Sequence, residues 1–487
     1  MEPQLEVHVP TPRPHLQRIG SRLYEVGTDF RPDMLVPARV FADEVLAEQM
    51  ARDRSLDQLV NVSTLRGIVR AAYGMPDMHE GYGFPVGGVA ATLLPDGVVS
   101  PGGIGFDINC GVRLLTSAIE YAAVGDRIEA VVHELSRSVP AGFGRASKQL
   151  AFDRAQLDHL LNEGVPYLVT ELSIGLPEDL ERMESGGRLP WARSEQVTER
   201  AKNRGHDQLG TLGGGNHFLE VQVVDEVYDR AAAKALGIEE GRVTLLIHTG
   251  SRGLGHQVCT DWLKVMDVVM PHYGIEVPDR QLACVPFSSR EGQGYFAAMA
   301  AAANFGFGNR HVIAHRARQV FTRILGPRAE LHLVYDVAHN TAKVEEHDEG
   351  QVCVHRKGAT RAFGPSSPEI PKAYRAVGQP VFIPGSMGTA SHVLVGTDAA
   401  AALSFGSCCH GAGRALSRTA SKRQVHGATL RKELEARGIV VRCASNAELA
   451  EEAPLAYKDV DRVVDVVHDA GIARKVARLV PVGVVKG

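Results

Sequence analysis

Glycine-rich loops recur along this 487-residue chain, and in each of them glycine stands beside a polar or ionisable side chain. Glycine lets backbone N–H groups approach a ligand closely, as phosphate-binding loops require. No segment matches the dinucleotide-binding or P-loop pattern in full, so neither motif identifies a ligand. The clearest loops span residues 81–88, 210–217, 248–253 and 384–388.

The distribution of glycine and proline favours one large domain over residues 1–487. The 51 glycines and 25 prolines are spread along the chain, and no Ser/Pro-rich linker, low-complexity tract or repeat marks a boundary. Length alone would allow more than one domain. Residues 1–20, with Pro10, Pro12 and Pro14, match no motif and are expected to form a surface arm.

The expected helices and strands do not alternate regularly. Short aliphatic runs predict strands at 111–115, 243–247 and 331–335, and helical patterns predict helices at 154–161, 295–304, 310–325 and 430–437. A doubly wound or barrel fold would need regular alternation. We therefore expect an irregular α+β fold, with mixed or antiparallel sheets surrounded by helices.

Composition is typical of a globular protein, with 44% hydrophobic and 23% charged residues. No apolar run approaches the length of a membrane helix, and the N-terminus lacks a secretory pattern, so we expect a cytoplasmic protein without a membrane partner. The net charge of -4 means that any nucleic-acid contact must rest on a local patch.

The cysteines do not form a disulfide pattern. Seven of them are scattered through the chain, so reduced thiols are expected. The adjacent pair Cys408 and Cys409 lacks the usual CxxC separation, which favours packing beneath a loop over a redox or metal site.

One glycine-rich turn carries both a carboxylate and a thiol. Asp107 and Cys110 lie three residues apart, and such a pair can share one metal ion or bridge two. Three histidines at strand or loop ends, His217, His248 and His339, bring the candidate ligands to five. Five ligands exceed one tetrahedral site, so two metals bridged by the thiolate become credible.

The residues alone leave the metal open. Thiolate and imidazole suit Zn²⁺, whereas carboxylate and bound phosphate oxygens suit Mn²⁺ or Mg²⁺.

His410 is the candidate nucleophile. It begins a glycine turn that we expect to lead into a helix, whose N-terminus would bind phosphate and keep the imidazole neutral. A neutral imidazole beside a phosphoryl group is a nucleophile, and Arg414 is positioned to stabilise charge on the phosphate. A capping turn with an incidental histidine remains the alternative.

Together these motifs resemble the RtcB family of GTP-dependent RNA-splicing ligases, and the resemblance implies an RtcB-like fold. It extends from about residue 70 to the last residue. The matching stretches are 76–88 (PDMHEGYGFPVGG), 105–113 (GFDINCGVR), 210–220 (GTLGGGNHFLE), 247–256 (IHTGSRGLGH), 335–340 (YDVAHN), 384–389 (PGSMGT), 410–414 (HGAGR) and 485–487 (VKG).

The resemblance implies a site with two Mn²⁺ ions and GTP. Asp107, Cys110 and His217 would hold one ion, and Cys110, His248 and His339 the other. His410 would carry the covalent guanylate. The implied guanylate contacts are Asn216, His217, Phe218, Leu219, Glu220, His339, Asn340, Pro384, Gly385, Ser386, Met387, Ser391, His410, Gly411, Ala412, Gly413, Tyr457 and Lys486. Arg252 is the expected RNA contact.

The implied reaction joins an RNA 3′-phosphate or 2′,3′-cyclic phosphate to a 5′-hydroxyl, for tRNA splicing or RNA repair. An archease-like activating protein is a candidate partner. Two alternatives stay open. A dinuclear metallophosphoesterase would use the same ligands without GTP, and a non-catalytic RNA-binding scaffold would use the metal structurally.

Overall fold

The computed structural model describes residues 13–142, 144, 146–147, 150 and 152–487.

Antiparallel pairing dominates the larger of the two main sheets, which has eight strands. Seven strands follow the order β11-β7-β9-β8-β19-β16-β15, and β18 pairs in parallel with β19. Their bounds are β11 His332–Ala338, β7 Gly111–Glu120, β9 Arg242–Thr249, β8 Phe218–Val227, β19 Ala473–Lys486, β16 Ser391–Gly396, β15 Pro380–Ile383 and β18 Val440–Cys443.

The second sheet has seven strands in the order β1-β2-β3-β4-β5-β13-β12, with one parallel pair, β3 and β4. Their bounds are β1 Gln17–Arg18, β2 Leu23–Val26, β3 Ala38–Phe41, β4 Ala72–His79, β5 Val86–Leu93, β13 Gly350–Lys357 and β12 Asn340–His347. Two short pairs complete the strands: β6 Val98–Val99 with β10 Val285–Pro286, and β14 Ala359–Arg361 with β17 Ser407–Cys409.

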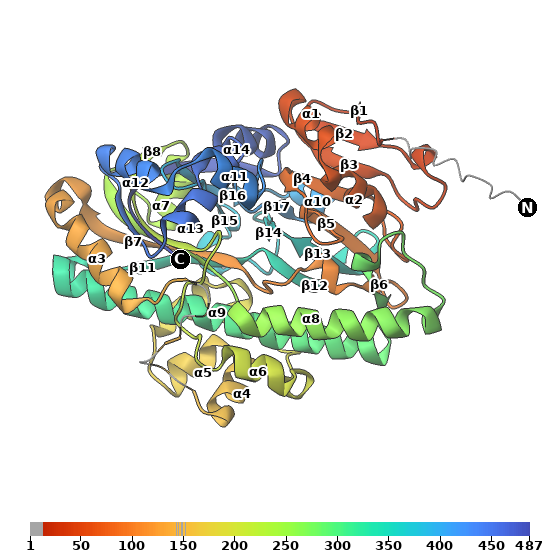
Figure 1. Cartoon of the computed structure of the whole chain (residues 1–487), viewed down its shortest axis with the longest axis horizontal. Coiled ribbons are helices and arrows are strands. Elements are labelled where there is room, and N and C mark those ends of the chain that lie inside the picture. The colour runs from red at the N-terminus through yellow and green to blue at the C-terminus, as the bar shows by residue number, and fades with distance from the viewer. Residues whose placement is uncertain (1–12, 143, 145, 148–149, 151) are drawn as a thin grey trace, which may run out of the picture.

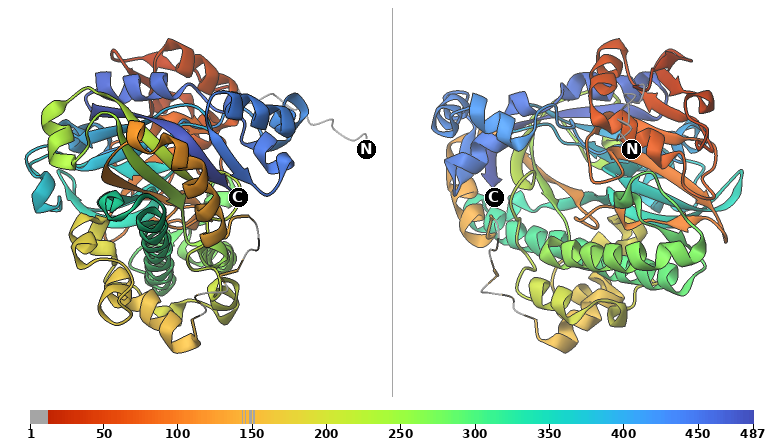
Figure 2. Two further views of the ribbon diagram at one scale, coloured as in Figure 1. Left: turned by 90° about the vertical axis from the view of Figure 1, so that its left-hand side faces the viewer. Right: turned by 45° about the vertical axis from the view of Figure 1, so that its right-hand side comes forward.

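Helices cover the sheets on several sides (Figures 1 and 2). The long helices α8 and α9 lie side by side below the sheets in Figure 1, with α4, α5 and α6 beyond them. Among the described residues, no helix is both long and apolar enough to cross a membrane. The helices are α1 Glu44–Arg52, α2 Arg54–Val62, α3 Ile128–Ser138, α4 Arg154–Glu163, α5 Val165–Thr170, α6 Glu199–Gly205, α7 Arg230–Leu236, α8 Arg252–Val269, α9 Arg290–Leu325, α10 Ala399–Ser404, α11 Arg418–Gln424, α12 Gly427–Ala436, α13 Asn446–Glu451 and α14 Val460–Asp469.

The expected fold class is confirmed. The two main sheets are mixed but largely antiparallel, and helices surround them. The strands predicted at 111–115, 243–247 and 331–335 match β7, β9 and β11, and the helices predicted at 154–161 and 430–437 match α4 and α12; the predictions extend one residue before β11 and one residue past α12.

The two helices predicted at 295–304 and 310–325 are one helix, the 36-residue α9. Gly306 and Gly308 separate the two predictions, yet both remain helical. A Cβ on Gly306 would lie 3.0 Å from the Cβ of Asn109, and one on Gly308 would lie 2.9 Å from Leu160. These glycines therefore allow close packing against α9 and do not end the helix.

The expected surface arm at 1–20 is only partly described. Residues 1–12 lie outside the described part of the chain. Within the remainder, Gln17 and Arg18 form the edge strand β1 by pairing with β2.

A buried charge cluster ties α9 to the larger sheet. The side chains of Arg113, Arg310 and Asp336 are all fully buried. Arg310 donates to both oxygens of Asp336, and Arg113 donates to one of them at 2.6 Å. Since two guanidinium groups share one carboxylate, loss of that carboxylate would leave two buried charges without an anionic partner.

We predict that Asp336→Ala lowers the free energy of unfolding by about 3–5 kcal/mol or prevents folding, as expected when one member of a buried ion pair is removed. Urea denaturation measures the change. Glu48→Ala is the control, because it breaks an exposed ion pair to Arg52 and should leave the midpoint unchanged. Equal effects from the two variants would contradict this account.

Candidate functional site

Four neighbouring strands of the larger sheet bring the five expected metal ligands together at one end of the strands. β7 and β8 begin at this end of the sheet, whereas β9 and β11 finish there, because all three pairings are antiparallel. Cys110 immediately precedes β7, His217 precedes β8 and His339 follows β11. His248 is the penultimate residue of β9 and pairs with Val112 on one side and Phe218 on the other.

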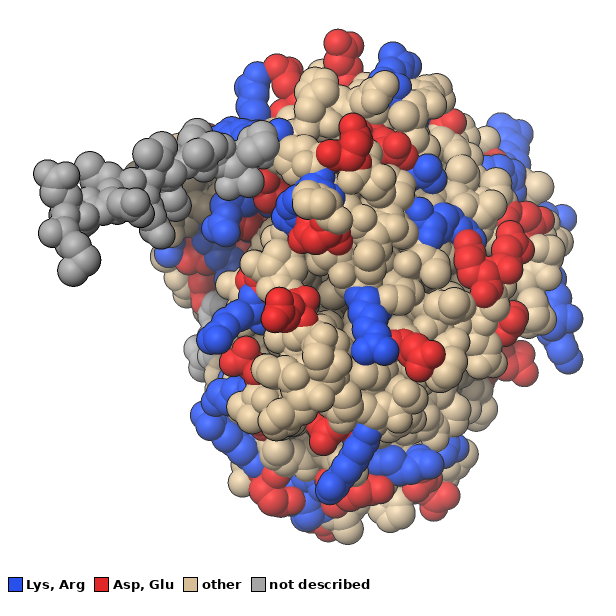
Figure 3. Space-filling view, turned by 90° about the vertical axis from the view of Figure 1, so that its right-hand side faces the viewer, with Lys and Arg blue, Asp and Glu red and all other residues tan. Residues whose placement is uncertain are grey.

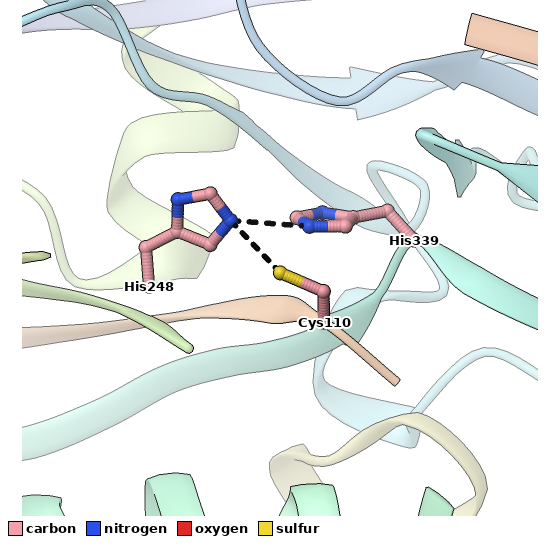
Figure 4. Close-up of side chains that lie close together, drawn as sticks. All are labelled: Cys110, His248 and His339. Carbon is pink, nitrogen blue, oxygen red and sulfur yellow. Dashed lines mark hydrogen bonds between the residues drawn. The ribbon is translucent and has the colours of Figure 1, made fainter. Parts of the chain in front are cut away.

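One group of candidate ligands contains Cys110, His248 and His339. Their ligand atoms all lie within 4.8 Å of one another. Figure 4 shows His248 Nε2 facing both other side chains, at 3.3 Å from Cys110 Sγ and 3.2 Å from His339 Nε2. All three side chains are buried, so the atoms converge away from bulk water.

A second group contains Asp107, Cys110 and His217, again within 4.8 Å. His217 Nε2 lies 2.7 Å from Asp107 Oδ2 and 3.5 Å from Cys110 Sγ. The two groups share the Cys110 thiol, and this is the partition that the resemblance implied.

The hydrogen bonding of His217 fits a cation at this position. Its Nδ1 lies 2.8 Å from the backbone oxygen of Leu212, an acceptor, so Nδ1 is the donor in that contact. In the tautomer with its proton on Nδ1, Nε2 is an acceptor, yet it faces the Asp107 carboxylate. Two acceptors at this distance require a proton or a metal ion between them.

The other group also fits a cation. The Nδ1 atoms of His248 and His339 are buried and have no hydrogen-bond partner in the described structure. Burial lowers the pKa of both rings well below the ordinary histidine value, which keeps them neutral. Neutral imidazole is the form that binds metals.

Cys110 needs a cation to act as a thiolate. Burial, followed by the Asp107 charge, raises the pKa of its thiol well above the ordinary value. Burial also opposes ionisation of Asp107, but His217, the hydrogen bond to Cys110 and the charge of Arg252 together outweigh it, and the pKa of that carboxyl is lowered. Metal binding would release the thiol proton, because the thiolate is the ligand.

Residues of α9 hold the three ligand turns together. Arg310 Nη1 donates to the backbone oxygens of Asn109, at 2.7 Å, and Thr249, at 2.8 Å. Asn309 accepts from Gly210 N at 2.7 Å and donates to Gly250 O at 3.0 Å. The turns that carry Cys110, His217 and His248 are thus fixed to one helix.

His410 is held by an aspartate from the other sheet. Asp77 of β4 is fully buried, and its Oδ2 lies 2.6 Å from His410 Nδ1 and accepts from the His410 backbone N–H at 3.0 Å. The adjacent backbone oxygens of Pro76 and Met78 accept from Lys458. With Nδ1 donating to Asp77, Nε2 is the ring nitrogen left free to react.

The predicted helix after His410 is wrong. Residues 410–417 are not helical, and α11 begins only at Arg418. Instead of a helix N-terminus, it is Asp77, 333 residues away in sequence, that contacts and orients the ring. Sequence reasoning missed this partner, although Asp77 lies in the matched stretch 76–88 and an acidic residue beside a glycine-rich loop was a usable signal.

His410 and most of the expected guanylate contacts line one cavity of about 280 Å³. The candidate metal ligands Asp107, Cys110, His248 and His339 line it as well. The expected guanylate contacts on its wall are Asn216, Phe218, His339, Asn340, Pro384, Gly385, Ser386, Met387, His410, Gly411, Ala412, Gly413, Tyr457 and Lys486.

Four expected guanylate contacts are not on the cavity wall. His217 lies behind it among the metal ligands. Leu219 is fully buried in an apolar cluster because successive residues of β8 point to opposite faces. Glu220 and Ser391 are buried and do not line the cavity. Gln222 Nε2 joins them by donating to both at 2.9 Å. Burial raises the pKa of Glu220 to about 7.

Arg414 and Tyr457 form part of the wall together. Arg414 donates to Glu452 and to the Tyr457 hydroxyl, and its guanidinium lies 5.1 Å from the centre of the Tyr457 ring. The Tyr457 hydroxyl also donates to Glu452. The Arg414 charge is therefore partnered within the protein, and its direct effect is to fix the Tyr457 ring.

Arg252 remains a candidate RNA contact. It begins α8, and its Nε donates to Thr211 Oγ1 at 3.0 Å beside the Asp107 turn. Arg310 and His311 of α9 are fully buried and therefore do not contact RNA. On the face in Figure 3, acidic and basic side chains are interspersed, so no single-sign patch covers it.

This chain is similar in sequence to known proteins over most of its length. A family model described as "tRNA-splicing ligase RtcB" matches residues 58–487. The chain belongs to the RtcB family. Two archaeal relatives named tRNA-splicing ligase RtcB, from Archaeoglobus fulgidus and Thermococcus kodakarensis, are each 52% identical to it over 479 residues, or 97% of this chain and 99% of each relative.

A bacterial RtcB relative is similarly close. The protein from Mycobacterium tuberculosis, named RNA-splicing ligase RtcB, is 54% identical over 436 residues, or 88% of this chain and 100% of the relative. The RtcB resemblance of the sequence motifs is thereby confirmed over most of the chain, including every stretch that contributes to the cavity.

Proposed function

We propose that this protein is an RNA ligase that joins RNA 3′-phosphate or 2′,3′-cyclic phosphate ends to 5′-hydroxyl ends through a guanylated His410. The observation that carries the proposal is the Asp77–His410 contact in the cavity lined by the Cys110-centred ligand groups. The RtcB relatives, all named as splicing ligases, support the same reaction class.

The ligand set fits two Mn²⁺ ions, one held by Asp107, Cys110 and His217 and the other by Cys110, His248 and His339. When bound, the ions would neutralise phosphate oxygens in the cavity. The protein's part is to hold the shared thiol at the centre of both groups and to keep His248 and His339 neutral by burial.

Guanylate transfer would begin with His410. Its Nε2 attacks the α-phosphorus of GTP, so that an N–P bond forms and the bond to pyrophosphate breaks. Asp77 stabilises the positive charge that develops on the imidazole, because Nδ1–H already donates to its carboxylate.

Two further transfers complete the reaction. An oxygen of the RNA 3′-phosphate, formed where necessary by opening a cyclic phosphate, attacks the guanylate phosphorus and the N–P bond breaks. The 5′-hydroxyl oxygen of the second strand then attacks the RNA 3′-phosphorus, the hydroxyl proton is lost and GMP leaves. The cavity would contribute chiefly alignment and charge neutralisation.

The guanylate would occupy the cavity beside Tyr457 and Lys486. Tyr457, fixed by Arg414 and Glu452, offers a ring for stacking on the base. Lys486, the penultimate residue, donates to the backbone oxygen of His217 at 3.1 Å. This contact links the guanylate position to a proposed metal ligand. A metallophosphoesterase would need neither the part of the cavity beside Tyr457 and Lys486 nor the Asp77–His410 pair.

The cellular setting belongs to the same proposal. All seven cysteines are free thiols, which fits a reducing cytoplasm. The RNA substrates would be tRNA halves or broken RNA ends, with an archease-like protein as the candidate activator.

We predict that incubation with Mn²⁺ and GTP labelled at the α-phosphate gives a protein adduct that is acid-labile and alkali-stable, as a phosphoramidate is. A denaturing gel and mass spectrometry locate the label on His410. His159→Ala, which alters an exposed histidine on α4, is the matched control and keeps the adduct. An adduct that persists in His410→Ala would refute the proposal.

We predict that Asp77→Asn lowers the rate of His410 guanylation about 10²–10⁴-fold, because the carboxylate no longer fixes the ring or stabilises its charge. Single-turnover guanylation measures the loss. Asp461→Asn is the matched control, since Asp461 holds His392 at 2.7 Å outside the cavity, and its rate should equal that of the unaltered chain. A similar loss in both variants would contradict the role of Asp77.

We predict that Cys110→Ala abolishes binding of both Mn²⁺ ions, whereas Asp107→Ala loses one and retains the other, because only the thiol belongs to both groups. Titration calorimetry gives the stoichiometry. The control Cys259→Ala removes a buried thiol that is outside the ligand groups, and it should bind two ions. Two ions bound to Cys110→Ala would exclude a shared thiolate.

A further inference from the structure

Lys357 is a buried cation on the wall of the catalytic cavity. It is the last residue of β13 and only 5% exposed. Its ammonium donates to the backbone oxygens of Tyr82 and Phe84, both at 2.8 Å. No carboxylate in the described part of the chain pairs with it, and an ammonium has three protons to donate, so one donor stays available.

The electrostatic setting favours an incoming anion. Burial lowers the pKa of Lys357 to about 7, and Cys259 opposes this with a smaller effect. A buried ammonium without a counter-charge is unfavourable. An anion bound beside it would stabilise the charged form, as a phosphate does at a lysine in other sites.

Lys357 lies between the nucleophile and the metal turn. The next residue, Gly358, has a positive φ of 59°, and a Cβ there would lie 2.9 Å from His410 Cε1. A Cβ on Gly105, two residues before Asp107, would lie 3.2 Å from Lys357 Cε. A phosphate at Lys357 would therefore be close to both His410 and the Asp107 turn.

A row of aromatic rings stands beside this lysine. The Phe106 ring lines the cavity and lies 5.1 Å from Tyr82, whose backbone oxygen binds Lys357, and 4.9 Å from the exposed His256 ring. Phe106 and His256 are stacked with an interplanar angle of 25°. Aromatic rings next to a cation are the usual means of holding a single-stranded nucleotide.

We propose that Lys357 binds the terminal phosphate of the RNA strand that ends in a 3′-phosphate, and that the Phe106–His256 row packs against its last base. This inference rests on the proposed ligase function and adds a subsite to it. A 3′-terminal phosphate carries about two negative charges, whereas a 5′-hydroxyl end has none at its terminus. The unpaired cation therefore fits the phosphate-bearing strand.

The experiment uses the full chain after His410 has been loaded with labelled guanylate. Transfer of the label to an RNA with a 3′-phosphate is followed in a single turnover at increasing RNA concentration. Only loaded molecules are counted, so the yield of loading does not enter. Lys357→Met should raise the half-saturating RNA concentration at least about tenfold, Lys357→Arg should restore it to within about threefold, and His256→Ala should raise it about threefold or more.

Gln58→Leu is the matched control. Gln58 accepts from Gly81 N at 2.9 Å and donates to Gly81 O at 2.7 Å, so it anchors the same loop as Lys357 without carrying charge. It should transfer guanylate like the unaltered chain. If Gln58→Leu reproduces the effect of Lys357→Met, or if Lys357→Met has no effect, the lysine is no phosphate subsite and the proposal fails.

A second arm distinguishes the two strands. RNA already carrying guanylate at its 3′ end is sealed to increasing concentrations of a 5′-hydroxyl strand. Lys357→Met should leave the half-saturating concentration of that strand unchanged, and a rise there without one in the first arm would overturn the assignment. Failure of the ligase proposal is seen separately, because the unaltered chain would then take up no guanylate from GTP at all.

Discussion

The contact of Arg310 with the turn that carries Cys110 is the interaction on which the site depends. Its fully buried guanidinium donates to backbone oxygens of the Cys110 and His248 turns and to Asp336 in β11, the strand that leads to His339. Three strand ends that carry candidate metal ligands are thereby fixed by one side chain. A group this deeply buried permits few alternative arrangements, since any movement would leave charges unpaired.

The location of the site follows from the antiparallel order of the strands. β11, β7, β9 and β8 alternate in direction. The starts of β7 and β8 therefore lie beside the ends of β9 and β11, and the candidate ligands meet at that end of the sheet. The second sheet faces these strand ends with Asp77 and Lys357, and His339 is the single residue between β11 and β12. The larger sheet thus supplies the candidate ligands, while the second orients His410 and lines the opposite wall.

Much of the site was predictable from sequence because its residues carry their chemistry in short motifs. A thiol three residues from a carboxylate, and histidines beside glycines at strand ends, pointed to one shared centre, and the structure brings all five together. Asp77 was not predicted, because its contact with His410 joins residues far apart in sequence and depends on how the sheets pack. The same holds for Lys357, which only the folded chain brings beside the Asp107 turn.

The fold was predictable in class but not in detail. Aliphatic runs identified β7, β9 and β11, yet their order depends on long-range pairing that no local pattern encodes. In α9, Gly306 and Gly308 suggested a break, whereas their small size serves packing against Asn109 and Leu160. After His410, glycines suggested a helix start, but Asp77 and the Tyr457 segment hold that stretch in a non-helical form.

The proposed sharing of the Cys110 thiolate by two metal ions beside His410 can be observed directly. The experiment is anomalous diffraction at the manganese edge from crystals grown with Mn²⁺. We expect two peaks, both within bonding distance of Cys110 Sγ, one toward Asp107 and His217 and the other toward His248 and His339. A single peak, or two peaks of which only one contacts the sulfur, would contradict it.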